Sequence, residues 1–133
     1  MPVFANGSKL KLLSCSLPIQ RIMDEAIKHI DIAITCGHRD EEDQQEAFLS
    51  GKSKLQYPYS KHNTHPSNAV DFVCFVDGKP HWGKELTIST AFFIKGIAAA
   101  QGVKIRCGCD WNGNFLTSDE SFMDAFHLEI IES

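Results

Sequence analysis

The sequence of 133 residues lacks a long apolar run and a surplus of basic residues. A membrane-spanning helix needs about 20 predominantly apolar residues. The longest apolar stretch, 91–100, is interrupted by Lys95 and Gly96, so we expect no stable membrane insertion. Thirteen basic residues against seventeen acidic ones give a net charge of −4. This charge argues against a nucleic-acid-binding protein, which normally carries a basic surplus to meet the phosphates.

Paired cysteines and a secretion signal are also missing. The five cysteines are odd in number, and only Cys107 and Cys109 lie close together. One residue separates this pair, whereas the cysteines of structural zinc sites are usually separated by two or more. The N-terminal lysines are not followed by the apolar stretch that a signal peptide requires. We therefore expect reduced thiols and synthesis in the cytoplasm without a signal peptide.

Length and composition are those of one globular domain, since 43% of the residues are apolar and 23% are charged. Apolar periodicity predicts helices over 18–30, 40–50 and 86–101, and strands over 30–35, 69–76, 103–106 and 125–131. Asp77-Gly78 predicts a hairpin turn after the second of these strands. The expected fold is a single α+β domain spanning 1–133, with a small, mainly antiparallel sheet packed with helices.

Two short motifs imitate ligand-binding loops. Gly51-Lys52-Ser53 resembles the end of a phosphate-binding loop, but Glu46 stands where the first glycine belongs, and the triplet closes a helix instead of opening one. Asp110-x-Asn112-x-Asn114 resembles the start of a calcium loop, but Phe115 stands at its glycine position. The first motif is therefore excluded as a phosphate site, and calcium dependence stays open.

The residues best suited to chemistry are His62, Asp71, Asp124 and His127. His62 lies in a polar loop, whereas Asp71 and His127 interrupt apolar strands, where an unpaired polar group is costly. Imidazole and carboxylate together suit zinc, and three protein ligands with one open position make a catalytic site. In the alternative interpretation, His127 is a hydrogen-bonded core histidine and Asp71 a turn or cap residue. The sequence predicts a zinc site on the sheet.

These residues stand in motifs that resemble those of a known family. Ser60-Lys61-His62 with Ala69-Val70-Asp71, followed by Asp124-x-x-His127-x-Glu129, resembles the zinc peptidases that cut bacterial cell-wall peptides. These include D,D-carboxypeptidases and the L-alanyl-D-glutamate endopeptidases that bacteriophages use as endolysins. Further matches are Gly37-His38-Arg39 followed by Gln44, Gly51-Lys52-Ser53 and Gly108-Cys109-Asp110-Trp111. The resemblance runs from Ser16 to Ile131 and is greatest to the phage endopeptidase branch.

The resemblance implies roles for six residues: zinc ligands His62, Asp71 and His127, catalytic base Asp124, and substrate-binding residues Arg39 and Ser60. One spacing departs from the family pattern, because the usual motif has seven positions between the first histidine and the aspartate. The spacing from His62 to Asp71 is longer than this, and the spacing from His65 to Asp71 is shorter. His65 therefore remains an alternative ligand. Glu129 remains an alternative base, although we expect it to orient a ligand.

The implied function is that of a Zn²⁺-dependent peptidoglycan endopeptidase that cleaves the L-alanyl-D-glutamate bond of stem peptides, as a phage or prophage endolysin. We expect a monomer that is made in the host bacterial cytoplasm and reaches the cell wall or periplasm after release. The alternatives are a D-alanyl-D-alanine carboxypeptidase and a non-catalytic module that binds cell-wall peptides.

Overall fold

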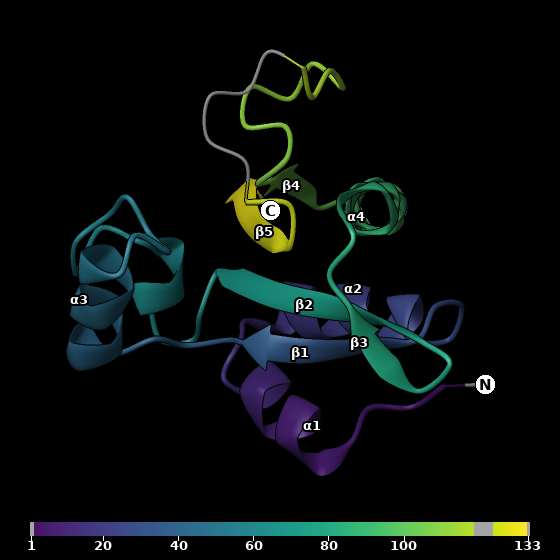
Figure 1. The fold of residues 1–133 in the computed structure, drawn as a ribbon, viewed down its shortest axis with the longest axis horizontal. Helices are drawn as coiled ribbons and strands as arrows, with labels where there is room; N and C mark the ends of the chain where they lie inside the picture. The colour runs from purple at the N-terminus through teal and green to yellow at the C-terminus, as the bar shows by residue number, and fades with distance from the viewer. Residues whose placement is uncertain (1, 119–123, 133) are drawn as a thin grey trace.

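The computed structural model describes residues 2–118 and 124–132. Within these ranges the elements follow the order α1 (Asn6–Leu13), α2 (Leu17–Ala26), β1 (Ile32–Cys36), α3 (Glu41–Leu49), the short 3₁₀ helix η1 (Lys61–Asn63), β2 (Ala69–Val76), β3 (Lys79–His81), α4 (Lys84–Ala100), β4 (Lys104–Cys107) and β5 (His127–Glu132) (Figure 1). None of the helices in the described ranges is long and apolar enough to cross a membrane.

The strands form one antiparallel sheet in the order β1-β2-β5-β4. β2 is the longest strand and shares one of its edges between two partners. Its first residues pair with β5, and its last residues pair with β3 across the hairpin at Asp77-Gly78. The expected antiparallel sheet packed with helices is therefore confirmed, and β2 is the strand that joins the two halves of the sheet.

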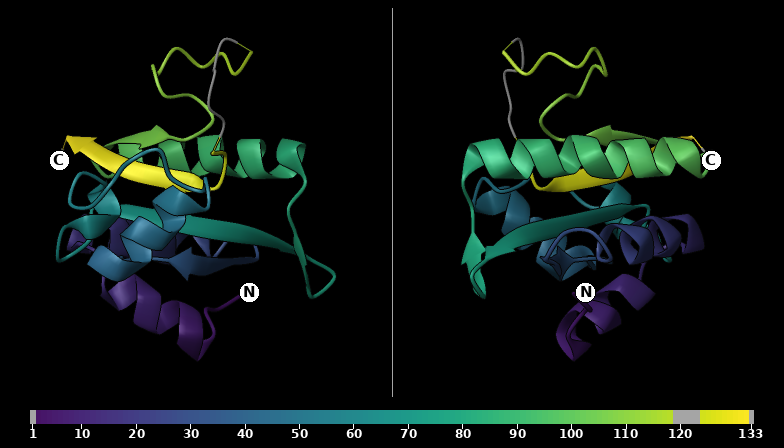
Figure 2. Two further views of the ribbon diagram at one scale, coloured as in Figure 1. Left: turned by 60° about the vertical axis from the view of Figure 1, so that its left-hand side comes forward. Right: turned by 90° about the vertical axis from the view of Figure 1, so that its right-hand side faces the viewer.

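The two faces of this sheet carry different side chains, because successive residues of a strand point to opposite faces. On one face, Val70, Phe72 and Cys74 of β2 are buried in the hydrophobic core. α2 and α4 supply the other side of this core and pack against each other (Figure 2). The opposite face of β2 carries Asp71, which places its carboxylate away from the core helices.

Local signals in the sequence explain most element boundaries. Asp40 caps α3, because its Oδ1 accepts a hydrogen bond from the backbone N–H of Asp43 at 2.9 Å. The predicted strand 69–76 has the bounds of β2. The predicted helix 18–30 ends earlier, at Ala26, and the chain continues in turns before β1.

α1 has no counterpart among the predicted elements. Only Ser8 and Leu12 of this helix are buried, while Leu10 and Leu13 are 70% and 66% exposed. A helix with so narrow a buried stripe shows no clear helical period in its sequence. It forms because α1 packs against β1, a tertiary contact that local sequence does not reveal.

Candidate metal centre and active site

The antiparallel register brings three polar side chains into one row across the sheet. Cys36 of β1 pairs with Asp71 of β2, and Asp71 pairs with His127 of β5. His62, the fourth member, comes from η1. Its Nε2 lies 3.1 Å from Asp71 Oδ1 and 3.2 Å from His127 Nδ1, and the last two atoms are also 3.1 Å apart. The three atoms form a nearly equilateral triangle.

The two imidazole rings are held by their outer nitrogens. His62 Nδ1 donates to the carbonyl oxygen of Gly37 at 2.7 Å, and His127 Nε2 donates to Glu129 Oε1 at 2.8 Å. Glu129 is fixed in turn by Arg106, whose Nη2 lies 2.8 Å from Glu129 Oε2. In each ring, the nitrogen that faces Asp71 is therefore free to present a lone pair.

The triangle attracts positive charge. Burial alone would lower the pKa of His62, but the Asp71 carboxylate outweighs burial and raises the pKa to about 10. The pKa of His127 rises in the same way, against burial, to about 9 through Asp71 and Glu129. Burial would raise the pKa of Asp71, yet the two imidazoles hold it well below its ordinary value.

The donor set fits zinc. Zinc bonds to nitrogen and oxygen are about 2.0–2.2 Å long, so the ligand atoms of a tetrahedral site lie about 3.3–3.5 Å apart. The observed separations of 3.1 to 3.2 Å are close to this spacing. Two imidazole nitrogens and one carboxylate oxygen leave a fourth position open, as in catalytic zinc sites.

Cys36 makes a second ligand set conceivable, because one ligand atom each from Cys36, His62 and Asp71 lie within 4.8 Å of one another. Its Sγ is 3.8 Å from His62 Nδ1. That nitrogen is the one that donates to Gly37, so it is not available to a metal while this hydrogen bond is in place. The geometry therefore favours His127 over Cys36 as the third ligand.

Asp124 is placed beside the triangle by its backbone. Its N–H donates to the carbonyl oxygen of Gly108, and its own carbonyl accepts from the N–H of His127, each at 2.9 Å. A side chain at Gly108 would overlap the Asp124 backbone, so the close approach requires glycine. Burial and the negative charge of Asp71 raise the pKa of Asp124 to about 6. This value suits a carboxylate that takes up and releases a proton near neutral pH.

The surroundings of Glu129 shift its pKa in the opposite direction to that of Asp124. Burial would raise its pKa, but His127 and Arg106 lower it to about 2. Both of its oxygens are engaged, one by each of these residues. Glu129 therefore fixes the orientation of the His127 ring, whereas the pKa of the Asp124 carboxyl group lies closer to neutral pH.

Of the remaining predicted residues, Arg39 and Ser60 lie beside the triangle, and His65 does not. Arg39 Nη2 lies 3.6 Å from Asp71 Oδ2, and its Nη1 donates to Gln44 Oε1 at 3.0 Å. The hydroxyl of Ser60 accepts from the N–H of His62 at 3.2 Å and so shapes the turn that carries this ligand. His65 is exposed and stacks edge-on against His38, with ring centroids 4.8 Å apart. The structure thus brings His62, and not His65, to the triangle.

Three supporting residues were not predicted to have these roles. They are Gly37, Gln44 and Arg106. The fully buried Gln44 accepts from Arg39 and from Asn63 Nδ2, so it ties α3 to η1. Nothing in the acidic sequence of α3 indicates that this one amide is buried. Arg106 lies opposite Glu129 in the pairing of β4 with β5. Its contact with Glu129 could be predicted only from a known register of these two strands.

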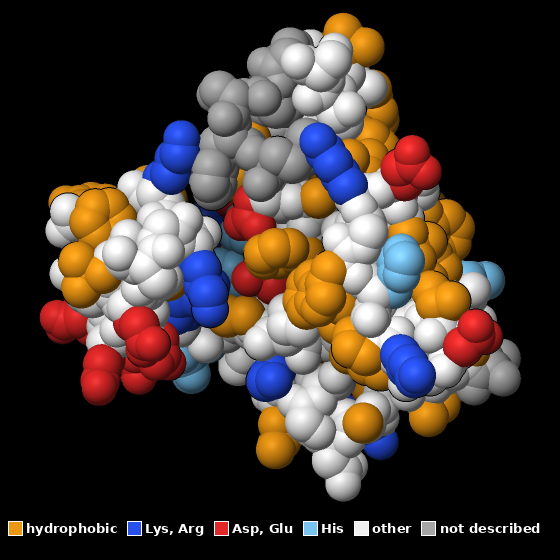
Figure 3. Space-filling model, viewed as in Figure 1, with side chains coloured by type: hydrophobic (Ala, Val, Ile, Leu, Met, Phe, Trp, Pro, Cys, Tyr) orange, Lys and Arg blue, Asp and Glu red, His pale blue; other side chains and the backbone are white. Residues whose placement is uncertain are grey.

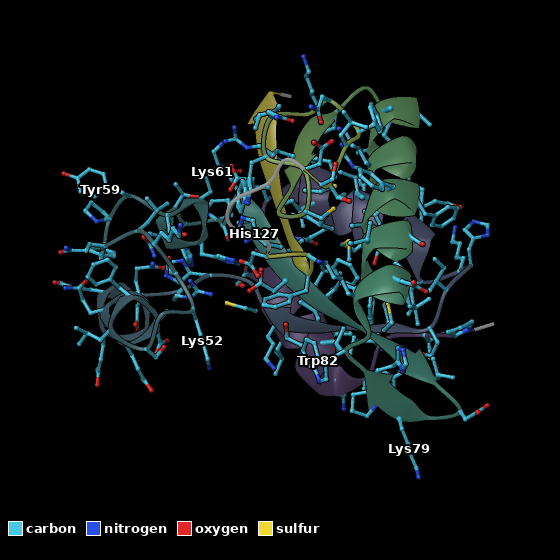
Figure 4. The ribbon with its side chains drawn as sticks, turned by 45° about the horizontal axis from the view of Figure 1, so that its top comes forward. Lys52, Tyr59, Lys61, Lys79, Trp82 and His127 are labelled. Carbon is cyan, nitrogen blue, oxygen red and sulfur yellow. The ribbon has the colours of Figure 1, made fainter. Side chains whose placement is uncertain are left out.

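The three residues of the triangle, together with Asp124 and Glu129, line a pocket of about 280 Å³ between the sheet and the segment that follows α3. Figure 3 shows the hollow, with acidic and histidine side chains at its floor and basic ones at its rim. Figure 4 shows His127 projecting from β5 toward this opening. Trp111 lies beside the His127 ring, with centroids 5.5 Å apart, and Phe126 also lines the pocket. A peptide can therefore reach the triangle from solvent.

The chain is similar to known proteins over nearly its whole length. A family model described as phage L-alanyl-D-glutamate peptidase matches residues 3–131. The L-alanyl-D-glutamate peptidase of Escherichia phage T5 is 27% identical over 135 residues, which cover 96% of this chain and 97% of that protein. The crystal structure of the Serratia marcescens L-Ala D-Glu endopeptidase ChiX superposes with a TM-score of 0.76 over 96% of this chain and 90% of that chain. At 19% identity, this last match supports the fold.

Proposed function

Because the chain belongs to the phage L-alanyl-D-glutamate peptidase family, we propose that it is a zinc peptidase that cleaves the bond between L-alanine and D-glutamate in peptidoglycan stem peptides. The observation that carries the proposal is the triangle of His62 Nε2, Asp71 Oδ1 and His127 Nδ1 at the floor of an open pocket. A closed structural site would have no need of such a pocket.

His62, Asp71 and His127 would hold the zinc ion. A zinc ion bound there would supply a water molecule that loses its proton near neutral pH, and would polarise the carbonyl group of the scissile bond. The hydrogen bonds from His62 to Gly37 and from His127 to Glu129 keep the ligand nitrogens aimed at one point. This arrangement lowers the cost of reorganisation when substrate binds.

Asp124 serves as the general base. Its carboxylate accepts a proton from the attacking water and passes it to the nitrogen of D-glutamate, which leaves as an amine. A partly buried carboxylate suits both steps, because its pKa of about 6 lets it bind the proton and release it again. The backbone bonds to Gly108 and His127 hold Asp124 at the rim of the triangle.

Arg39 stabilises the negative charge that develops on the carbonyl oxygen. Its guanidinium is mostly buried and already faces Asp71, so its charge acts in a region with little water to screen it. Gln44 holds Nη1 of Arg39 and thereby fixes the orientation of the guanidinium plane.

As a phage endolysin, the protein would be made in the host bacterial cytoplasm and would meet its substrate in the cell wall after release. All residues that line the pocket belong to one chain, so we propose that the protein is a single domain over 1–133 and is active as a monomer.

Digestion of purified peptidoglycan by the zinc-loaded protein, followed by mass spectrometry of the fragments, tests the proposal. We expect fragments that begin with D-glutamate, and no such fragments after chelation of the metal. Release of terminal D-alanine alone would indicate a carboxypeptidase. Wall binding that survives chelation, without any cleavage, would indicate a non-catalytic module.

A further inference from the structure

One basic side chain in the pocket wall has no partner among the residues that the structure describes. The cations that line the pocket are Arg39, Lys52, Lys54 and Arg106. Arg39 faces Asp71, Arg106 pairs with Glu129, and Lys54 is also engaged. Lys52 makes no hydrogen bond or ion pair with any residue in 2–118 or 124–132. Its charge is therefore available to a bound molecule.

The backbone around Lys52 is nevertheless well fixed. Gly51, with a φ of 83°, turns the chain back after α3, a conformation that glycine adopts without strain. Gln44 Nε2 then donates to Ser53 Oγ at 3.0 Å and to the Leu55 carbonyl at 2.7 Å. The same buried amide group accepts from Arg39, so Lys52 is held in register with the residues at the floor of the pocket.

Two aromatic side chains, Trp111 and Phe126, also line the pocket. Phe126 lines the pocket and packs against the exposed Trp82, with ring centroids 5.8 Å apart. In the view of Figure 4, Lys52 lies below and to the left of His127, and Trp82 lies below it and to the right. A substrate with a negative group on one side of the scissile bond would therefore be bound in one direction.

The substrate of the proposed reaction has such a group. A glutamyl residue joined through its nitrogen and one carboxyl group keeps a second carboxylate, close to the nitrogen of the scissile bond. We propose that Lys52 binds this free carboxylate of the D-glutamyl residue and so selects unamidated stem peptides. This inference rests on the proposed cleavage site, and Lys52 is a specificity residue that takes no part in the chemical step.

The experiment uses two synthetic peptides with the zinc-loaded protein. In both peptides L-alanine is joined to D-glutamate, and the chain continues through the γ-carboxyl group of D-glutamate. The α-carboxyl group of D-glutamate is free in one peptide and a carboxamide in the other. Wild-type kcat/KM should be about 5- to 20-fold higher for the free acid, the range expected for a charge-assisted hydrogen bond at a partly exposed site. Lys52→Gln should lose this preference and should cleave the carboxamide peptide at nearly the wild-type rate.

Lys79→Gln is the matched control, since Lys79 is an exposed lysine of β3 that points away from the pocket (Figure 4). It should keep the wild-type preference. Equal wild-type rates on both peptides would overturn the inference and leave the proposed function intact. The inference would also be overturned if Lys54→Gln lost the preference and Lys52→Gln kept it. It would be overturned as well if Lys52→Gln lowered kcat/KM equally for both peptides. If wild-type protein cleaves neither peptide, the proposed function fails and this inference fails with it.

Discussion

Asp71 and His127 lie directly opposite each other on β2 and β5, and Asp71 Oδ1 is 3.1 Å from His127 Nδ1. The contact therefore depends on the register of two strands that are more than fifty residues apart in the sequence. A shift of one residue would turn either side chain to the core face. The proposed metal site thus depends on the pairing of the strands, and the pairs His127–Glu129 and Glu129–Arg106 extend the polar cluster along the same face.

The first prediction concerns the third metal ligand. His127→Ala should lose most of its bound zinc and its activity, because only two of three ligands remain. Cys36→Ala should keep both, since Cys36 contacts the outer nitrogen of His62 and not the triangle. Zinc content after dialysis, measured by elemental analysis, checks both variants. Zinc retained in His127→Ala and lost in Cys36→Ala would assign the ligand set to Cys36, His62 and Asp71.

The second prediction separates the general base from the orienting carboxylate. Asp124→Asn should bind zinc as wild type does, while turnover falls by roughly 10²–10⁴-fold, the usual contribution of a positioned acid–base group. Glu129→Gln should lose less activity, because an amide can still accept the hydrogen bond from His127 Nε2. Single-turnover cleavage of a wall peptide, together with zinc content, measures both effects. Near-normal cleavage by Asp124→Asn would give the base role to another group.

Much of this arrangement could be predicted from the sequence, and the rest could not for identifiable reasons. A polar residue in an apolar strand marks Asp71 and His127, and the Ser-x-His context marks His62. Strand period also places Glu129 on the face of His127. The missing parts depend on distant contacts. Neither the burial of Gln44 nor the pairing of Arg106 with Glu129 is visible until the chain is folded.

The third prediction concerns the space beside Asp124. In Gly108→Ala, the new methyl group would overlap the carbonyl group and Cβ of Asp124, so the backbone must move. We expect activity to fall by at least about tenfold with a smaller loss of zinc, since the displaced residue, Asp124, is the one that we propose as the base. Gly96→Ala is the matched control, because Gly96 is exposed in α4 and has open space around it. It should raise the free energy of unfolding by about 0.5–1 kcal/mol without changing activity. Unchanged activity in Gly108→Ala would contradict this account of how Asp124 is positioned.

The last prediction tests whether Gln44 joins the substrate wall to the metal centre. Gln44→Ala would remove the acceptor of Arg39 Nη1, and it would leave the carbonyl oxygen of Leu55 with only the longer hydrogen bond from Ser53 Oγ. Because buried polar groups without partners are costly, the free energy of unfolding should fall by about 1–3 kcal/mol in urea denaturation. Gln45→Ala is the control, since this neighbour is exposed and its side-chain oxygen accepts only a long hydrogen bond of 3.4 Å, from the N–H of Tyr57, among the described residues. If Gln44→Ala were as stable as Gln45→Ala and kept the preference for a free carboxylate, the loop from Lys52 to Leu55 would be positioned by something other than the buried amide.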